Sequence, residues 1–226
     1  GPRFIEALAG GGAVYVANSG SNSVSVINPV TNTVIKNITV GASPGSIHRY
    51  GDAVYVANSE SNSVSVINLV NNTVIKNITV GAYRISITTS MDAIYVANGE
   101  SNTVSVINPA NNTVIKNITV GASPGSIYGF GDAVYVANGE SNTVSVINPA
   151  NNTVIKNIKV GANPGSIYGF GGAVYVANSD SNTVSVINPV TNDVVAGVTF
   201  DINPFVGGQI ICNGLDAPIN RYFYVS

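Results

Sequence analysis

The chain has 226 residues, of which 45% are hydrophobic and only 9% are charged, and its formal net charge is -2 at pH 7. This composition excludes an intrinsically disordered chain, because disordered segments are polar or highly charged. It also excludes the basic patch that nucleic-acid binding requires, so nucleic acid is not expected as a partner. No apolar run approaches the length of about 18 residues that a membrane-spanning helix needs, so no transmembrane segment is predicted.

A repeat with a period of 40 residues dominates the chain. Each copy contains the string YVAN followed by a near-copy of SNTVSVIN, and the five copies of YVAN begin at Tyr15, Tyr55, Tyr95, Tyr135 and Tyr175. The complete repeats span about 4–43, 44–83, 84–123, 124–163 and 164–203. The remainder, 204–226, begins in the phase of a further repeat and is predicted to be a degenerate half blade, a latch or a cap. A fixed period of this kind indicates a repeat architecture within a single domain, 1–226.

Each repeat is predicted to form four β-strands. In the fourth repeat, runs rich in Val, Ile, Tyr and Thr occupy 125–130, 133–138, 143–148 and 153–160, and Gly, Pro, Asn and Ser separate them. The short breaks predict an antiparallel meander with apolar side chains on both faces, which must pack between copies of itself. A period of about 40 residues with four strands is typical of an all-β β-propeller, in which each sheet forms one blade.

The closure of the blades has several solutions. We favour a five-blade ring in which 204–226 serves as a latch or cap. A six-blade ring with an incomplete terminal blade and a fragment that needs other chains are the alternatives. No strand exchange between the first and last repeats is visible, because the first repeat already carries its own inner strand, FIEALAG.

The segment YVANSGSNSVSVINPVTNTVIKNITVG resembles the YVTN-type β-propeller repeat, whose hallmark is Tyr-Val-x-Asn followed by an S-N-x-V-S-V-I segment. The resemblance covers about 4–203. That family is typical of archaeal surface-layer and other cell-surface proteins, so the resemblance implies an extracellular scaffold or adhesion role. Family members often have seven blades, and the repeat count departs from that. The third repeat also departs, because it reads YRISITTSMD where its neighbours read SPGSIYGFGD.

A four-strand meander sorts its turns between two ends of the sheet. One end, called here the Glu end, gathers the links between repeats with the second turns, which carry an acidic set interrupted by Gly20: Glu60, Glu100, Glu140 and Asp180. This set is the first candidate binding site, for cations or sugar hydroxyls, although turn carboxylates are commonly only solvated. The opposite end, called the Asp end, gathers the first and third turns with Asp52, Asp92 and Asp132.

The innermost strands place three aromatic side chains at one position, where they are candidates to line the central axis: His48, Tyr128 and Tyr168. Such rings could stack on sugars, although packing at the centre is their commoner role. His48 is the only histidine, and its predicted equivalents, which include Leu8, favour a structural role. Since the single Cys212 lies far from it in sequence, no metal site and no cofactor are predicted.

Asn-X-Ser/Thr sequons recur with the repeat and are candidates for N-glycosylation: Asn37, Asn71, Asn77, Asn111, Asn117 and Asn151. Three functions are considered. A non-enzymatic extracellular or cell-surface scaffold comes first, with other surface proteins, glycans or copies of the chain as partners. A multivalent lectin, with equivalent shallow sites between blades, comes second. A propeller lactonase-like or lyase-like enzyme comes last, because the chain offers a single histidine.

Overall fold

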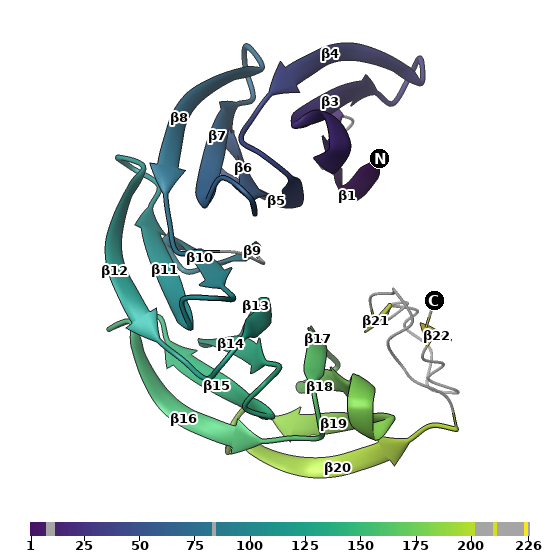
Figure 1. Ribbon diagram of the computed structural model, residues 1–226, viewed down its shortest axis with the longest axis vertical. Coiled ribbons are helices and arrows are strands. Elements are labelled where there is room, and N and C mark those ends of the chain that lie inside the picture. Colours follow the sequence, from purple (N-terminus) through teal and green to yellow (C-terminus); the bar gives the residue numbers. More distant parts are fainter. Residues whose placement is uncertain (8–11, 83–84, 202–209, 212–223, 226) are drawn as a thin grey trace. The chain divides into compact units, whose positions relative to one another are not determined.

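The computed structural model describes the whole chain except residues 8–11, 83–84, 202–209, 212–223 and 226 (Figure 1). The described part contains five four-stranded antiparallel sheets and one two-stranded pair. The chain divides into two compact units, Gly1–Thr119 and Val120–Ser226.

The first unit holds three sheets, and in each of them the strands follow one another in sequence order. The first sheet contains β1 (Pro2–Ala7), β2 (Val14–Asn18), β3 (Ser23–Asn28) and β4 (Thr33–Thr39). The second contains β5 (Pro44–Tyr50), β6 (Ala53–Asn58), β7 (Ser63–Asn68) and β8 (Thr73–Thr79). The third contains β9 (Ile85–Ser90), β10 (Ala93–Asn98), β11 (Thr103–Asn108) and β12 (Thr113–Thr119).

The second unit holds two sheets of the same kind. One contains β13 (Pro124–Phe130), β14 (Ala133–Asn138), β15 (Thr143–Asn148) and β16 (Thr153–Lys159). The other contains β17 (Pro164–Phe170), β18 (Ala173–Asn178), β19 (Thr183–Asn188) and β20 (Asp193–Thr199). The second turn is a short 3-10 helix in the first sheet, η1 (Ser19–Ser21), and in the fifth, η2 (Ser179–Ser181).

The strands predicted from the sequence are confirmed to within one residue in the fourth repeat, where β13 begins at Pro124 and β16 ends at Lys159. The predicted half blade lies largely outside the described residues. Within it, the structure describes only β21 (Ile210–Ile211) paired with β22 (Tyr224–Val225). The replacement of Pro-Gly by Arg84-Ile85 in the third repeat lies at the edge of an undescribed segment, and β9 begins at Ile85.

Neighbouring sheets within a unit pack face to face through apolar side chains. Between the first and second sheets, Tyr15 and Val24 pack against Val54 and Val56, all of which are at most 2% exposed. The same arrangement recurs between the second and third sheets and between the fourth and fifth. Such burial is the main stabilising term for blades that would each expose two apolar faces alone.

The tyrosine of YVAN also makes a polar link to the next sheet. Tyr55 donates a hydrogen bond from Oη to Oδ1 of Asn112 at 2.9 Å, and Tyr135 donates in the same way to Asn192 at 2.9 Å. Tyr15 donates to Asn72 in the first unit. Each acceptor lies in a third turn with positive φ, 54° at Asn112, a conformation that asparagine tolerates better than most residues. The repeat therefore carries its own coupling between sheets.

The asparagine of YVAN holds its own sheet together. Asn58 is fully buried and donates from Nδ2 to Ser63 at 3.2 Å and to Ser65 at 2.9 Å. Ser65 in turn donates to Oδ1 of Asn77 at 2.8 Å, so one chain of hydrogen bonds crosses three strands. The network recurs where the SVSV and KNI segments recur, and the fifth repeat, which reads AGV in place of KNI, lacks its asparagine acceptor.

Candidate functional site

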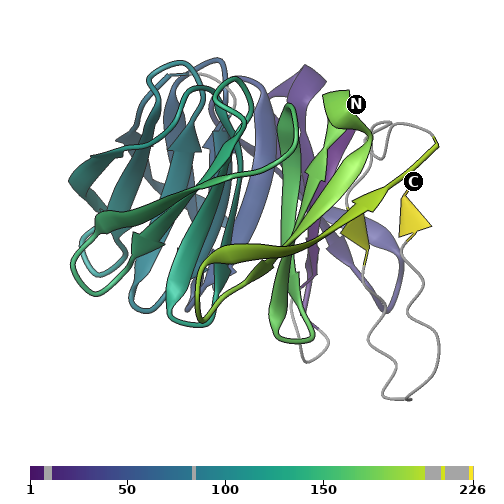
Figure 2. The same ribbon diagram turned by 90° about the horizontal axis from the view of Figure 1, so that it is seen from below.

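The second turns of the second to fifth sheets lie beside the links that precede those sheets, as the division into two ends predicts. Figure 2 shows that the turns gather at the two ends of the strands. The backbone N–H of Glu60 donates to the Ala42 carbonyl at 3.2 Å, and that of Asp180 donates to Ala162 at 3.1 Å. Glu100 and Glu140 occupy the same place in their sheets. All four side chains are exposed. Among the residues that the structure describes, no group of three or more His, Cys, Asp or Glu side chains could hold a metal ion.

His48 lies on β5 and contacts the neighbouring innermost strand, where its Nε2 is 3.2 Å from Oγ1 of Thr89. Burial lowers the pKa of its imidazole, and the carboxylate of Glu6 on β1 acts in the opposite direction. Glu6 pairs with Tyr15 as His48 pairs with Tyr55, so Glu6 is the true counterpart of His48. The equivalence with Leu8 was wrong, because the first turn of the first sheet is two residues longer than that of the second.

Tyr128 and Tyr168 pack on one another. Their ring centroids are 4.9 Å apart and the ring planes are inclined by 43°. Both side chains are half-buried, and they belong to the innermost strands β13 and β17. A tilted pair at this distance is a normal aromatic packing geometry, so each ring has a structural partner.

The six sequon asparagines fall into two structural sets, and all six side chains are exposed. Asn37, Asn77 and Asn117 lie on outermost strands and accept hydrogen bonds from serine hydroxyls of the third strands. The others lie in third turns, where Oδ1 of each accepts from the hydroxyl of its sequon threonine at 2.7 Å: Asn71, Asn111 and Asn151. Their modification stays a prediction.

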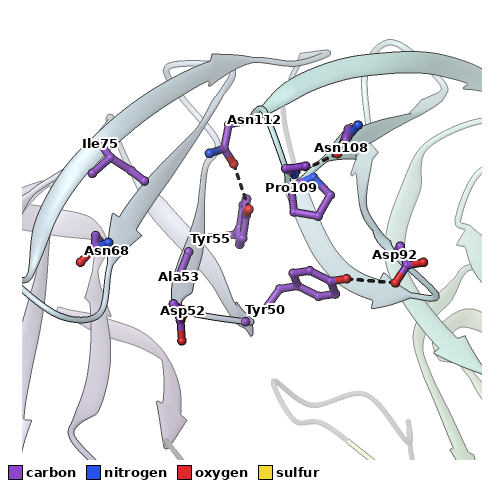
Figure 3. A pocket seen from close by; sticks show the side chains of 12 residues that line it. Tyr50, Asp52, Ala53, Tyr55, Asn68, Ile75, Asp92, Asn108, Pro109 and Asn112 are labelled. Carbon is purple, nitrogen blue, oxygen red and sulfur yellow. Dashed lines mark hydrogen bonds between the residues drawn. The ribbon is translucent and has the colours of Figure 1, made fainter.

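A cleft of about 440 Å³ lies between the second and third sheets, at the Asp end (Figure 3). Its volume falls in the range of small-molecule sites. Two first turns, two third turns and strand β8 enclose it, and the residues that line it are Tyr50, Gly51, Asp52, Ala53, Tyr55, Asn68, Ile75, Asp92, Asn108, Pro109, Ala110 and Asn112. A second cleft of about 370 Å³ contains Thr79, Ser101 and Asn117, and neither charged nor aromatic side chains line it.

Figure 3 shows the Tyr50 ring reaching across to the carboxylate of Asp92. Its Oη donates a long hydrogen bond of 3.4 Å to Oδ1 of Asp92. Burial raises the pKa of the Tyr50 phenol, and the Asp92 charge and this hydrogen bond raise it further. The phenol therefore stays protonated at neutral pH and remains a donor. Tyr55 forms the buried part of the lining, and burial raises its pKa to about 12.

The neighbouring strand decides where this aromatic ring lies. Phe130, at the register position of Tyr50, lies so close to Gly169 that a Cβ there would collide with the ring. In the third sheet, Thr89 occupies the register position of Gly169 and carries a full side chain. Its side chain fills the space that the Phe130 ring occupies over Gly169, so the Tyr50 ring cannot lie there. Instead, Tyr50 extends along the turn toward Asp92.

The backbone of the cleft is held rigidly. The Asp52 carbonyl accepts from the Leu69 N–H at 3.0 Å, which ties the first turn of the second sheet to its third. In the third sheet, Oδ1 of Asn108 accepts from the Ala110 N–H at 2.9 Å, and the Asn108 carbonyl accepts from the Asn112 N–H at 2.8 Å. Fixed turns of this kind present side chains with little entropy left to lose on binding.

The sequence reasoning looked first at the Glu end and missed this cleft. A signal was nevertheless present in the third repeat, where Thr89 and Ser90 replace the Gly and Phe of the later repeats. Tyrosine also replaces phenylalanine at residue 50, next to Asp52. The cleft arises because the change at Tyr50 in the second repeat lies next to the changes at Thr89 and Ser90 in the third. Comparing one repeat with another does not show that these changes are neighbours.

No family model matches the chain. The PE-PGRS family protein PE_PGRS18 of Mycobacterium tuberculosis (strain ATCC 25618 / H37Rv) is 60% identical over 37 residues, which cover 16% of this chain and 8% of that protein. That stretch is shorter than one repeat. The likeness therefore concerns the repeat and not the protein as a whole.

Solved structures resemble the chain over most of its length. A functionally unknown protein from Desulfotomaculum acetoxidans DSM 771 has a TM-score of 0.74 at 18% identity, covering 92% of this chain and 74% of that one. KlHsv2 with loop 6CD replaced by a Gly-Ser linker has a TM-score of 0.70 at 13% identity, covering 92% and 72%. Kuenenia stuttgartiensis hydrazine synthase has a TM-score of 0.64 at 17% identity, covering 90% and 88%. Similarity at these identities concerns the fold alone.

Together, the repeated four-stranded antiparallel sheets and these structural neighbours define a β-propeller-like repeat fold. Within the described ranges, no helix has the length and apolar character needed to cross a membrane.

Proposed function

We propose that the chain is a non-enzymatic scaffold of an extracellular or cell-surface protein, built from YVTN-type blades, and that it binds its partners through the Asp end. The observation that carries this proposal is an exposed valine that recurs at one position of the third turn in three of the five repeats. Val30, Val70 and Val190 are 84%, 86% and 88% exposed at the tips of their turns. Single exposed valines are ordinary, but these three share one turn position in the first, second and fifth repeats, while Ala110 and Ala150 take it in the others.

The same hydrogen bonds fix each of these turns. Oδ1 of Asn28 accepts from the Val30 N–H at 2.8 Å, and Oδ1 of Asn188 accepts from the Val190 N–H at 2.8 Å. Preorganised apolar tips lose little conformational entropy on contact, which favours binding to a partner with a matching surface. The recurring polar residues support a scaffold as well, because Asn58, Ser65 and Asn77 are used to join strands.

A binding experiment with two matched triple variants tests this proposal. In the first, Val30, Val70 and Val190 become serine; in the second, three exposed apolar residues of the outer strands, Ile35, Ile115 and Ile155, become serine. We expect labelled wild-type protein and the outer-strand variant to bind cell-envelope fragments of the source organism. The turn variant should lose that binding. Equal binding by the two variants would contradict the assignment to the Asp end.

Closure into a five-blade ring is part of the same proposal. The five sheets and the structural neighbours support it. A closed ring predicts a monomer of 23.1 kDa whose small-angle scattering fits a compact disc with a central channel. A stable assembly of larger mass would instead favour the fragment that needs other chains.

Carbohydrate binding is a second candidate function. A specific observation favours it, namely the cleft that Tyr50, Asp52 and Asp92 line and in which Tyr50 contacts Asp92. Hydroxyl-rich ligands are recognised by carboxylate acceptors combined with an aromatic face.

A further inference from the structure

We infer that the cleft between the second and third sheets is a single binding site for one pyranose unit of a neutral saccharide. The inference deepens the carbohydrate-binding candidate and rests on it, because it names the site, the ligand class and the number of sites. It differs from a multivalent lectin, in which every junction between blades would bind alike.

The first argument is that equivalent junctions lack the same chemistry. Asp52 and Asp92 both line the cleft. At the junction between the first and second sheets, Gly12 stands at the register position of Asp52. At the junction between the fourth and fifth sheets, the fourth sheet has Asp132 in its first turn, but the fifth sheet has Gly172 at the corresponding position. Of these three junctions within the units, one alone unites two carboxylates.

The second argument concerns the aromatic side chain. Tyr50 presents a half-buried ring and a phenol hydroxyl at the cleft, whereas Phe130 and Phe170 have no hydroxyl at that position. Phe130 is also turned onto Gly169, as described above. Among the described aromatic residues at this register position, Tyr50 is therefore the one whose side chain lies within hydrogen-bonding distance of a carboxylate.

The third argument is the match between the lining and a sugar. Hydroxyl groups of a pyranose can donate to the carboxylate of Asp92, and charged acceptors give the stronger hydrogen bonds. The C–H face of the ring can lie on apolar surface, which Tyr50 and Pro109 supply beside Asp92 (Figure 3). The pair of carboxylates disfavours phosphate, sulfate and other anionic ligands. A neutral saccharide satisfies both the polar and the apolar parts of the lining.

The fourth argument is that the site needs little reorganisation. Asp92 and Tyr50 already form a hydrogen bond, at 3.4 Å, that an incoming hydroxyl can replace or shorten. The turns around them are fixed by the hydrogen bonds of Leu69 and Asn108. A cleft of about 440 Å³ is open enough for one sugar ring and too small for a long folded chain segment.

The test uses the complete chain and four probes, glucose, galactose, mannose and N-acetylglucosamine, each at millimolar concentration. Saturation-transfer NMR and calorimetry measure binding to wild type, to Asp92→Asn, to Tyr50→Ala and to Tyr50→Phe. Asp132→Asn is the matched control, because Asp132 occupies the same turn position in the fourth sheet. We expect at least one probe to bind with a stoichiometry of one sugar per chain.

We expect Asp92→Asn and Tyr50→Ala to weaken that binding by about tenfold or more, the effect typical of losing a charged acceptor or an aromatic platform. Tyr50→Phe keeps the ring and should weaken binding less than Tyr50→Ala, and Asp132→Asn should bind as wild type does. Circular dichroism confirms that each variant is folded. The inference is overturned if no probe binds, if Asp132→Asn weakens binding as much as Asp92→Asn, or if calcium binds in place of sugar. The envelope experiment with the valine variants can still succeed in each of those cases, so the failure of this inference is distinguishable from that of the proposed scaffold.

Discussion

Replacement of Gly121 by alanine is the perturbation that most directly tests how the blades are linked. Gly121 lies in the link before β13, and a Cβ at this position would lie 2.7 Å from Nδ2 of Asn138 and closer still to the hydroxyl of Ser141. Real Cβ contacts are essentially never that short, so Asn138 and Ser141 must move. Asn138 is fully buried, and therefore has little room to do so.

The magnitude follows from the hydrogen bonds that Asn138 would lose. Its Nδ2 donates to Thr143 at 3.1 Å and to Ser145 at 2.9 Å, while its buried Oδ1 has no hydrogen-bond partner among the described residues. Two hydrogen bonds contribute about 1 kcal/mol each, and a buried amide left unpaired costs about 1–3 kcal/mol more. Alanine also lowers the conformational entropy of the unfolded chain, which offsets about 0.5 kcal/mol of this loss of stability. The free energy of unfolding should therefore fall by about 2.5–4.5 kcal/mol.

Urea unfolding followed by circular dichroism measures this change, with Gly125→Ala as the matched control. A Cβ at Gly125 would have no atom within 4 Å, so that variant should be as stable as wild type or slightly more stable. Thermal unfolding should show a midpoint for Gly121→Ala that is lower by about 5–18 °C, given the usual entropy of unfolding for a chain of this size. If the two alanine variants unfold within about 0.5 kcal/mol of each other, the link does not depend on the Asn138 network and the reasoning fails.

Three further predictions concern single side chains. Tyr135→Phe removes the 2.9 Å hydrogen bond to Asn192 and should lower the free energy of unfolding by about 1 kcal/mol in urea titrations; an unchanged midpoint would show that this link between sheets contributes nothing. Burial lowers the pKa of His48 below its usual 6.5, so protonation favours the unfolded chain, and stability should decline as pH falls through about 6.5. His48→Gln should flatten that part of the curve of stability against pH, and an identical decline in the variant would assign it to other groups. Asn32 has φ of 55°, so Asn32→Ala should be less stable than Asn32→Gly by about 1 kcal/mol, and the reverse order in thermal melts would refute the role of this backbone angle.

The sequence predicted the strands well because their signals are local. Branched side chains alternate with turn residues, so β14 and β15 begin and end where the pattern changes. The bond from Tyr55 to Asn112 could not be predicted in the same way, since it joins residues 57 positions apart and every repeat offers both partners. The cleft was also beyond local patterns. It depends on a carboxylate from each of two sheets and on the side chain of Thr89. The effect of Thr89 becomes clear only when the pairing register of the strands is known.

The same regularity that hides the cleft in the sequence explains how such a site can exist without disturbing the fold. Turn geometry is set by Asn108 and its counterparts, whose hydrogen bonds involve backbone atoms, and the coupling between sheets is set by Tyr55 and Asn112. Residues such as Tyr50 and Asp92 take no part in those bonds, and Asp92 is exposed. Substitutions of Asp92 therefore cost little stability, as surface changes usually do, whereas Tyr50 also packs against the apolar cluster between the second and third sheets. A repeat array of this kind can acquire a distinct binding chemistry at one junction while it keeps the hydrogen bonds that join its sheets, as the departures in the third repeat illustrate.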